Sequence, residues 1–328
     1  MNETKKFIKE DCNSIRLDIF LSLKLNVNRS QIQYLIKNNL VNVNNTLAKK
    51  SGVILKNGDC IEIRKLEVDS NAKSIDSIDS IESKNSISIT RIYEDNDFLV
   101  LNKPPFLIVH PAPTTKEKTL LHWLRENNIR LSSISGELRE GIVHRLDKET
   151  SGAMLVAKNN FFHSFLSSQL QNKNVGRIYI AIIDLELSKN LSIECYLSRH
   201  PNNRLKIAKI TNEKKGKYSK SSFYKLLSSS NGKKELILAK LHTGRTHQIR
   251  AHLESINRHI IGDSLYGYKG EKTRVMLHSY LLFLPHPKFG RMVFKAELFD
   301  DMKTYLANNF DMERVNEIIK NIDINFYN

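Results

Sequence analysis

The sequence predicts an α+β protein. We expect a large domain in which a mixed, largely antiparallel sheet and flanking helices surround a central cleft, preceded by a small N-terminal α/β domain. Many short apolar or alternating runs follow residue 90, and they do not alternate regularly with helices as βαβ units do. An acidic, polar segment separates two basic parts of the 328-residue chain. This segment is therefore interpreted as the boundary between the two domains.

The small domain is predicted to span residues 1–66. Ser30 and Gln33 have the capping-box spacing that starts a helix. The residues up to 36 then place three apolar side chains on one helical face, which predicts a helix here. Residues 41–43 alternate as in a strand, and the Asn-Asn pair at 44–45 favours a turn. Residues 60–63 follow a second turn and predict another strand.

Residues 67–90 are predicted to form a linker. They repeat Ser, Ile and Asp, contain no Gly, Pro or aromatic residue, and carry five acidic and two lysine side chains. By contrast, residues 1–66 have 12 basic and 6 acidic residues. Such a polar, biased composition favours a flexible connection. The alternative is an ordinary surface loop with an isolated strand.

The large domain is predicted to span residues 91–328. The periodicity of apolar residues predicts several strands and helices in this domain. The expected strands cover residues 91–93, 98–101, 178–182 and 236–240, and the expected helices cover residues 119–125 and 161–171.

The charge balance favours a polyanionic partner. Lys and Arg number 51 against 35 Asp and Glu, a net charge of +16. Such an excess on a soluble chain indicates nucleic acid, although it can also serve solubility alone. The first 16 residues lack the apolar core of a signal peptide, and no run reaches membrane length. Three distant cysteines suit reduced thiols in the cytoplasm, and the histidines lack metal-ligand spacing.

The most informative motif is the segment 141–152, GIVHRLDKETSG. It places one aspartate, Asp147, among His, Arg, Lys, Thr and Ser. This segment closely resembles the HRLDxxTSG signature of the RluA/RluC/RluD-type pseudouridine synthases. The flanking sequence is more similar to the RluD-type branch than to the RluC-type branch.

Further blocks resemble the same family in the same order, over about residues 90–300. They are NKPxxxxVHP at 102–111, RxYxA at 177–181, LHTGRTHQIRxHL at 241–253, DxxYG at 263–267 and LH at 277–278. The chain departs from the family at Pro105-Phe106, where a glycine is usual, which puts the shape of this loop in question. The part before residue 66 resembles the small RNA-binding domain first known from a ribosomal small-subunit protein.

The resemblance implies a catalytic role for Asp147. Converting uridine to pseudouridine breaks the bond between ribose and nitrogen, turns the base and joins ribose to a ring carbon. A single carboxylate suffices, either attacking the sugar carbon or removing a sugar proton to give a glycal. Burial disfavours a charged carboxylate, and a nearby cation restores it. The resemblance makes Arg250 that ion-pair partner, the alternative being a contact with an RNA phosphate or a surface charge.

Two further roles are implied by the resemblance. Tyr179 is expected to stack on the target base and to position it, because a phenol with a pKa of about 10 is a poor base at neutral pH. The alternative is a core tyrosine. Arg145 is expected to enter the RNA in place of the flipped uridine. His144 contacts the RNA backbone or, alternatively, supports the loop.

Other basic side chains are expected to contact RNA. Residues 243–246 are predicted to open a helix capped by Thr246, with Arg245 beside a helix end suited to phosphate. Lys103 in the upstream loop, and Arg29 and Lys37 in the small domain, are assigned the same role. The basic segment 214–220 is read equally well as an RNA contact or as a solvated loop.

Together these observations predict an RNA pseudouridine synthase that acts on large-subunit (23S) ribosomal RNA or on pre-ribosomal particles. We expect a cytoplasmic, monomeric isomerase without cofactor or metal. The alternatives are RluC-like site specificity or a non-catalytic RNA-binding assembly factor. An unrelated aspartate-dependent hydrolase would need a second acid or a metal cluster, which no motif supplies.

Overall fold

A computed structural model describes residues 4–10, 14–25, 32–33, 35–36, 39–64, 87–111, 115 and 117–323. The chain forms two compact units. The first comprises Met1–Ile87 with Ser133–Glu140, and the second comprises Ser88–Ser132 with Gly141–Asn328. No helix among the described residues is long and apolar enough to cross a bilayer. The capping serine predicted at Ser30 and most of the predicted linker lie outside the described residues, as do Arg29 and Lys37.

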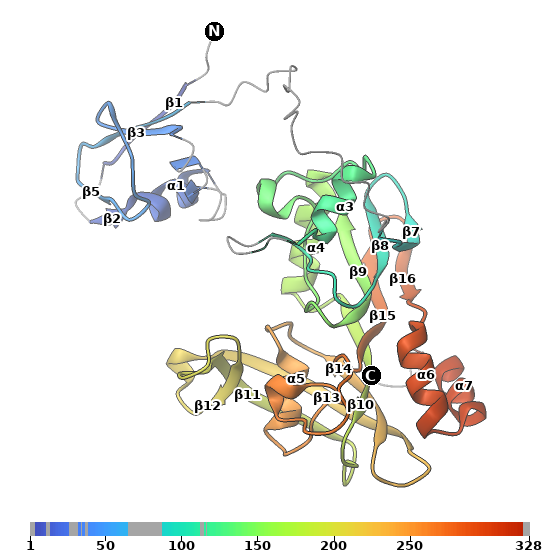
Figure 1. Ribbon diagram of the computed structural model, residues 1–328. Helices are drawn as coiled ribbons and strands as arrows, with labels where there is room; N and C mark the ends of the chain where they lie inside the picture. Colours follow the sequence, from blue (N-terminus) through green and yellow to red (C-terminus); the bar gives the residue numbers. More distant parts are fainter. Residues whose placement is uncertain are drawn as a thin grey trace. The chain divides into compact units, whose positions relative to one another are not determined.

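The N-terminal unit is a small sheet with a helix against an apolar core (Figure 1). Its elements are β1 (Thr4–Ile8), β2 (Ile15–Arg16), α1 (Leu17–Leu25), β3 (Val41–Val43), β4 (Thr46–Leu47), β5 (Ile54–Leu55) and β6 (Cys60–Arg64). The strand order is β1-β6-β3-β4, with β2 paired to β5. Both predicted strands and the turn are confirmed, since Asn44 and Asn45 take left-handed conformations between β3 and β4. Ile32 and Ile36 are buried and helical, as the periodicity predicts.

A ten-stranded sheet organises the second unit. Its strands are β7 (Thr90–Glu94), β8 (Phe98–Lys103), β9 (Ser151–Ala157), β10 (Gly176–Ile183), β11 (Leu191–Arg199), β12 (Ile207–Ile210), β13 (Lys217–Ser228), β14 (Glu235–Leu241), β15 (Leu277–His286) and β16 (Gly290–Lys295). Their order is β12-β11-β13-β14-β10-β15-β9-β8-β7, and β16 pairs with β15. Neighbours are antiparallel except for β9 and β15, which confirms the predicted mixed, largely antiparallel sheet.

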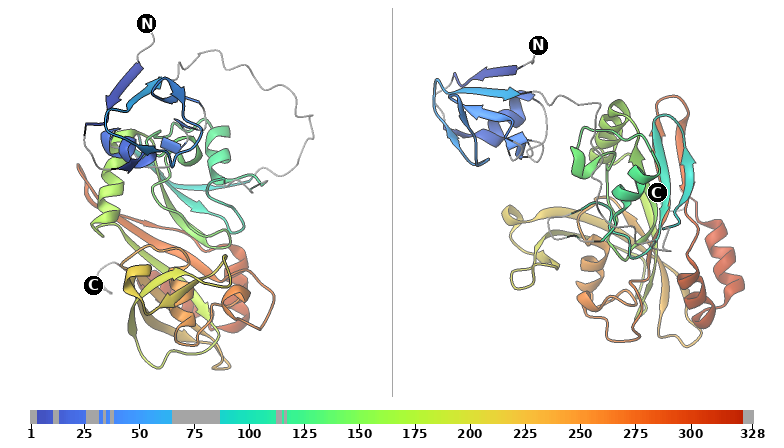
Figure 2. Two further views of the ribbon diagram at one scale, coloured as in Figure 1. Left: turned by 90° about the vertical axis from the view of Figure 1, so that its left-hand side faces the viewer. Right: turned by 45° about the horizontal axis from the view of Figure 1, so that its top comes forward.

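Helices flank this sheet. They are α3 (Leu120–Glu126), α4 (Asn160–Gln171), α5 (Gln248–Glu254), α6 (Asp300–Asn309) and α7 (Met312–Asn321), with 3-10 turns η1 (Glu137–Arg139), η2 (Glu213–Lys215) and η3 (Ser264–Tyr266). Figures 1 and 2 show α5 on one side of β10, β13 and β14, and the α6–α7 pair on the other. The helices predicted at 119–125 and 161–171 are α3 and α4, whose first turns are capped by Thr119 and Asn159.

The central strands are buried along their whole length, so their sequences are continuous apolar runs rather than alternating ones. Phe98 of β8 stacks on Phe162 of α4 with ring centroids 4.9 Å apart, which anchors this helix to the sheet. Side chains of β8, β9 and α4 share one core cluster, so the helix packs against both strands.

A glycine brings two central strands close together. Gly152 at the start of β9 pairs with Ser279 of β15, and its φ of +113° is a left-handed conformation. A Cβ atom at residue 152 would lie 2.3 Å from the Ser279 carbonyl oxygen, so only glycine permits this approach. Ser279 also pairs with Tyr179 of β10. The glycine of the 141–152 motif therefore brings the Asp147 loop near the strand that carries Tyr179.

Candidate active site

A pocket in the second unit collects the residues of the predicted site. Asp147, Tyr179 and Arg250 all line it, as do Arg145 and Arg245. Asp147 comes from the loop before β9, Tyr179 from β10 and Arg250 from α5. The structure therefore brings together residues that lie more than 100 positions apart in the sequence.

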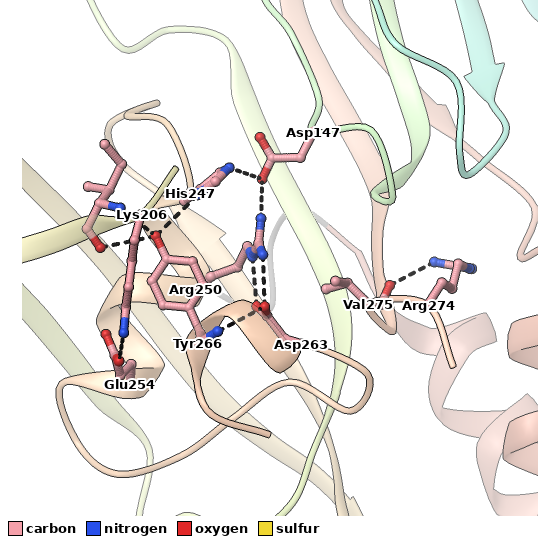
Figure 3. A network of polar contacts seen from close by, with 10 residues as sticks. Asp147, Lys206, His247, Arg250, Glu254, Asp263, Tyr266, Arg274 and Val275 are labelled. Carbon is pink, nitrogen blue, oxygen red and sulfur yellow. Dashed lines mark hydrogen bonds and ion pairs between the residues drawn. The ribbon is translucent and has the colours of Figure 1, made fainter. Parts of the chain in front are cut away.

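Asp147 is ion-paired at the pocket wall. Its Oδ2 atom accepts a hydrogen bond from Nη1 of Arg250 at 3.3 Å (Figure 3). Nε2 of His247 lies 3.7 Å from the same oxygen. Burial lowers the pKa of His247, so this imidazole is neutral at neutral pH and Arg250 is the cation that faces Asp147. The carboxylate side chain is 20% exposed, so it remains accessible from the pocket.

A second carboxylate fixes Arg250. Asp263 accepts hydrogen bonds from Nε at 2.6 Å and Nη2 at 2.7 Å, a bidentate arrangement, and it is almost fully buried. Burial opposes the charge on Arg250, but Asp263 and Asp147 raise its pKa above the ordinary value. The guanidinium also lies 4.8 Å from the Tyr266 ring centroid. Sequence reasoning noted the DxxYG block at 263–267 without recognising this function.

Tyr266 connects this network to a neighbouring strand. Its hydroxyl contacts Nδ1 of His247 at 3.1 Å and donates to the Ile207 carbonyl at 3.0 Å. The two rings meet edge to face. Through these contacts Tyr266 fixes the orientation of His247, which in turn faces Asp147.

Tyr179 is buried beside the pocket. Burial raises the pKa of its phenol, so the hydroxyl is protonated at neutral pH. The ring is therefore suited to packing against a flat ligand and not to removing a proton on its own.

Two of the residues assigned to RNA contact have their side chains engaged inside the protein instead. Lys103 is fully buried, and its ammonium donates to the carbonyls of Pro104, Leu107 and Lys148 at 2.7, 3.0 and 3.2 Å. It therefore ties the 104–107 loop to the residue next to Asp147. Nε2 of His144 accepts the backbone N–H of Leu155 at 2.8 Å, and burial lowers the pKa of this imidazole to about 3. The other ring nitrogen, Nδ1, is buried, so this geometry favours the structural alternative for His144.

The two predicted arginines at the pocket are exposed. Arg145 follows His144 in the sequence but faces solvent, and Arg245 donates from Nε to the Tyr218 carbonyl at 3.0 Å. The predicted cap by Thr246 is wrong, because α5 begins at Gln248 after a left-handed His247. Instead, Oε1 of Gln248 accepts from Oγ1 of Thr243 at 2.7 Å.

The loop that departs from the family keeps a glycine-like conformation. Phe106 has a φ of +65° and is 57% exposed. A bulky side chain rarely takes this conformation. The contacts of Lys103 with the carbonyls on either side hold the turn in place.

Comparisons with known proteins identify the family. The profile described as RNA pseudouridylate synthase matches residues 97–255, and the S4 domain profile matches residues 15–61. An uncharacterized RNA pseudouridine synthase of Helicobacter pylori strain J99 is 48% identical over 93% of both chains. The ribosomal large subunit pseudouridine synthase D of Borreliella burgdorferi is 32% identical over 94% of both chains.

A solved structure has a similar fold. Human RNA pseudouridylate synthase domain containing 1 superposes with a TM-score of 0.56 at 21% identity, over 72% of this chain and 96% of that one. The chain belongs to the RNA pseudouridine synthase family of the RluA/RluD type and carries an N-terminal S4 domain. It is an isomerase, and its partner is RNA.

Proposed function

We propose that this enzyme converts specific uridines of large-subunit ribosomal RNA to pseudouridine. The net charge of +16 suits a large polyanion, and the S4 domain adds a second RNA-binding unit. The similarity to a relative named for the large ribosomal subunit supports this substrate. We further propose that the enzyme acts as a cytoplasmic monomer, on free RNA or on assembling particles.

The domain boundaries proposed from the sequence suit this function. Residues 1–66 form the small RNA-binding domain, residues 67–90 the linker and residues 91–328 the catalytic domain. A linker lets the small domain bind RNA beside the target while the catalytic pocket binds the target uridine.

The ion-paired carboxylate in the pocket is the observation that carries the proposal. Asp147 attacks the sugar carbon or removes a sugar proton when the N-glycosidic bond breaks. Arg250 keeps the carboxylate charged, and Asp263 keeps Arg250 in place. A charged oxygen in a partly enclosed site is a stronger nucleophile or base than the same group in bulk water.

Base flipping delivers the uridine to this pocket. A uridine stacked in a helix cannot reach a carboxylate in the wall of a pocket, and flipping costs a few kcal/mol. We propose that exposed Arg145 fills the vacated position in the helix, since a guanidinium both stacks and donates hydrogen bonds. Tyr179 then packs against the uracil and orients it, and Arg245 binds the RNA backbone.

Mapping of pseudouridines tests this function. Ribosomal RNA is compared from cells with the gene, without it, and with Asp147→Asn in its place. We expect one or more large-subunit pseudouridines to disappear in both altered strains and to return with the wild-type gene. An unchanged map of large-subunit RNA would contradict the proposed substrate. Incubating purified enzyme with naked RNA and with precursor particles then distinguishes the two forms of substrate.

A further inference from the structure

A second arginine lies next to Tyr179 in the pocket. Arg177 and Tyr179 both belong to β10 and are two residues apart, so their side chains leave the same face of the strand. Both line the pocket together with Asp147. Arg177 is therefore positioned to touch whatever packs against Tyr179.

The Arg177 side chain is half-buried, and its Nε atom is shielded from solvent without a protein partner among the described residues. Its Nε atom is buried and has no hydrogen-bond partner, and within the described part of the chain no carboxylate pairs with it. Burial lowers its pKa, yet arginine remains charged in proteins. Buried charges are ordinarily paired, because an unpaired one loses its hydration without compensation. Asp263 provides this compensation for Arg250, whereas the buried Nε atom of Arg177 has no such partner in the ranges that the structure describes.

The missing side chain of Gly244 leaves space for this guanidinium. A Cβ atom on Gly244 would lie 2.5 Å from Nη1 of Arg177 and 3.0 Å from Nη2. Gly244 follows β14 and also lines the pocket, so the absent side chain lets the guanidinium pack against the backbone there. A charge held in this way at the pocket indicates a function for it.

We propose that Arg177 stabilises the negative charge that develops on uracil when its bond to ribose breaks. This inference rests on the proposed function. When the C1′–N1 bond breaks, the electron pair stays with the base, and uracil becomes an anion with charge on its carbonyl oxygens. Meanwhile C1′ bonds to Asp147, or Asp147 removes a proton from C2′ and a double bond forms between C1′ and C2′. Arg177 donates a hydrogen bond to a carbonyl oxygen and gives up no proton.

The charge on uracil then disappears in the second half of the reaction. The ring carbon C5 bonds to C1′ as the bond to Asp147 breaks or the sugar proton returns to C2′. The C5 proton then passes to solvent and N1 takes a proton from solvent, so the net change is a proton shift from C5 to N1. The guanidinium therefore meets a neutral base before and after the reaction and an anion only in between. A preorganised donor that acts on developing charge in a shielded site increases the rate of the chemical step.

A phosphate is a poorer fit for Arg177 than uracil. Phosphate is charged and hydrated before it binds, so carrying it into a shielded pocket is costly. Neutral uracil enters at little cost. The exposed arginines Arg145 and Arg245 are better placed for the RNA backbone. The position of Arg177 beside Tyr179 thus favours the base.

The leaving group provides the test. A ribosomal RNA fragment containing a site found by the mapping above is made once with uridine and once with 5-fluorouridine. Fluorine stabilises the base anion, so the fluorinated base depends less on the protein for this stabilisation. Single-turnover loss of the N-linked nucleoside is followed after nuclease digestion for wild type, Arg177→Met and Arg177→Lys. Lys240→Met serves as a control, because residue 240 pairs with Ile178 and so points to the opposite face of the sheet from Arg177.

We expect Arg177→Met to slow uridine conversion by about 100-fold. The loss should be smaller with 5-fluorouridine, and the RNA dissociation constant should be nearly unchanged. Arg177→Lys should convert uridine at an intermediate rate. If Arg177→Met unfolds at too low a temperature to be assayed, the two RNAs are compared with Arg177→Lys instead. An equal loss of rate on the uridine and the 5-fluorouridine RNA would overturn the proposal. A loss of RNA affinity alone, with a weaker salt dependence of binding, would also overturn it. Inactive wild-type enzyme on this fragment would instead refute the proposed function.

Discussion

Asp263 binds Arg250 more closely than Asp147 does, with two hydrogen bonds of 2.6 and 2.7 Å against one of 3.3 Å. The buried carboxylate therefore fixes the guanidinium, and the guanidinium presents its remaining nitrogen to the pocket. We expect Asp263→Asn to lower the free energy of unfolding by about 3 kcal/mol, because it leaves a buried charge short of its partner.

The activity of this variant separates two explanations. If Asp263 positions Arg250, Asp263→Asn should slow single-turnover conversion at temperatures where the protein is fully folded, with RNA affinity retained. Urea denaturation and a turnover assay at low temperature measure the two effects. A variant with wild-type stability and wild-type turnover would show that Asp263 has no positioning role.

Gly152 is expected to be intolerant of any side chain. Gly152→Ala places a Cβ atom 2.3 Å from the Ser279 carbonyl oxygen and strains the backbone at a φ of +113°. The free energy of unfolding should fall by roughly 3 kcal/mol or more. Gly290→Ala is the matched control, since its φ of +71° is also positive but no atom lies within 4 Å. It should cost only about 1 kcal/mol, and equal losses in the two variants would contradict the close approach of β9 and β15.

The buried Lys103 should make stability depend on pH. Burial lowers the pKa of Lys103 to about 7 from its ordinary value of 10.5, so between these values the folded protein binds fewer protons than the unfolded chain. The contribution of Lys103 to the free energy of unfolding must therefore rise with pH between these two pKa values, by at most about 1.4 kcal/mol per pH unit. The unfolding free energies of wild type and Lys103→Met, measured from about pH 6 to 9, should differ increasingly in favour of wild type. A difference independent of pH would contradict the lowered pKa of Lys103.

RNA binding should be strongly dependent on salt. A protein that neutralises about six phosphates loses roughly a thousandfold in affinity between about 50 and 200 mM salt. Arg245→Met should reduce the slope of log affinity against log salt by about one, as expected for one lost phosphate contact. Lys103→Met should leave the slope unchanged, because Lys103 is buried. Filter binding over a salt series measures both slopes, and a flat response of the wild type would remove the electrostatic basis for RNA binding.

Short runs of apolar residues predicted the positions of the central strands well, because buried strands need apolar side chains on both faces. Phe98 to Leu101 and Ile178 to Ile182 formed strands as expected. Side-chain surroundings could not be predicted in the same way. Lys103 belongs to a polar motif, yet its position at the end of a buried strand directs its ammonium to three carbonyls instead of RNA.

The partners of Arg250 illustrate the same limit. Asp147 precedes it by 103 positions and Asp263 follows by 13, so no periodicity relates them. Resemblance to the family suggested the first contact, whereas the second appears only when α5 and η3 are brought together. The cap of α5 was missed because His247 takes a left-handed conformation that ends the preceding turn, and Gln248 bonds back to Thr243.

Replacing Asp147 with asparagine tests the central claim most directly. Asp147→Asn keeps the shape of the side chain and removes its charge, so purified protein should bind the RNA fragment as wild type does and convert none of it in a single turnover. Mass spectrometry of the digested RNA measures the conversion. Pseudouridine formed by this variant would contradict the account.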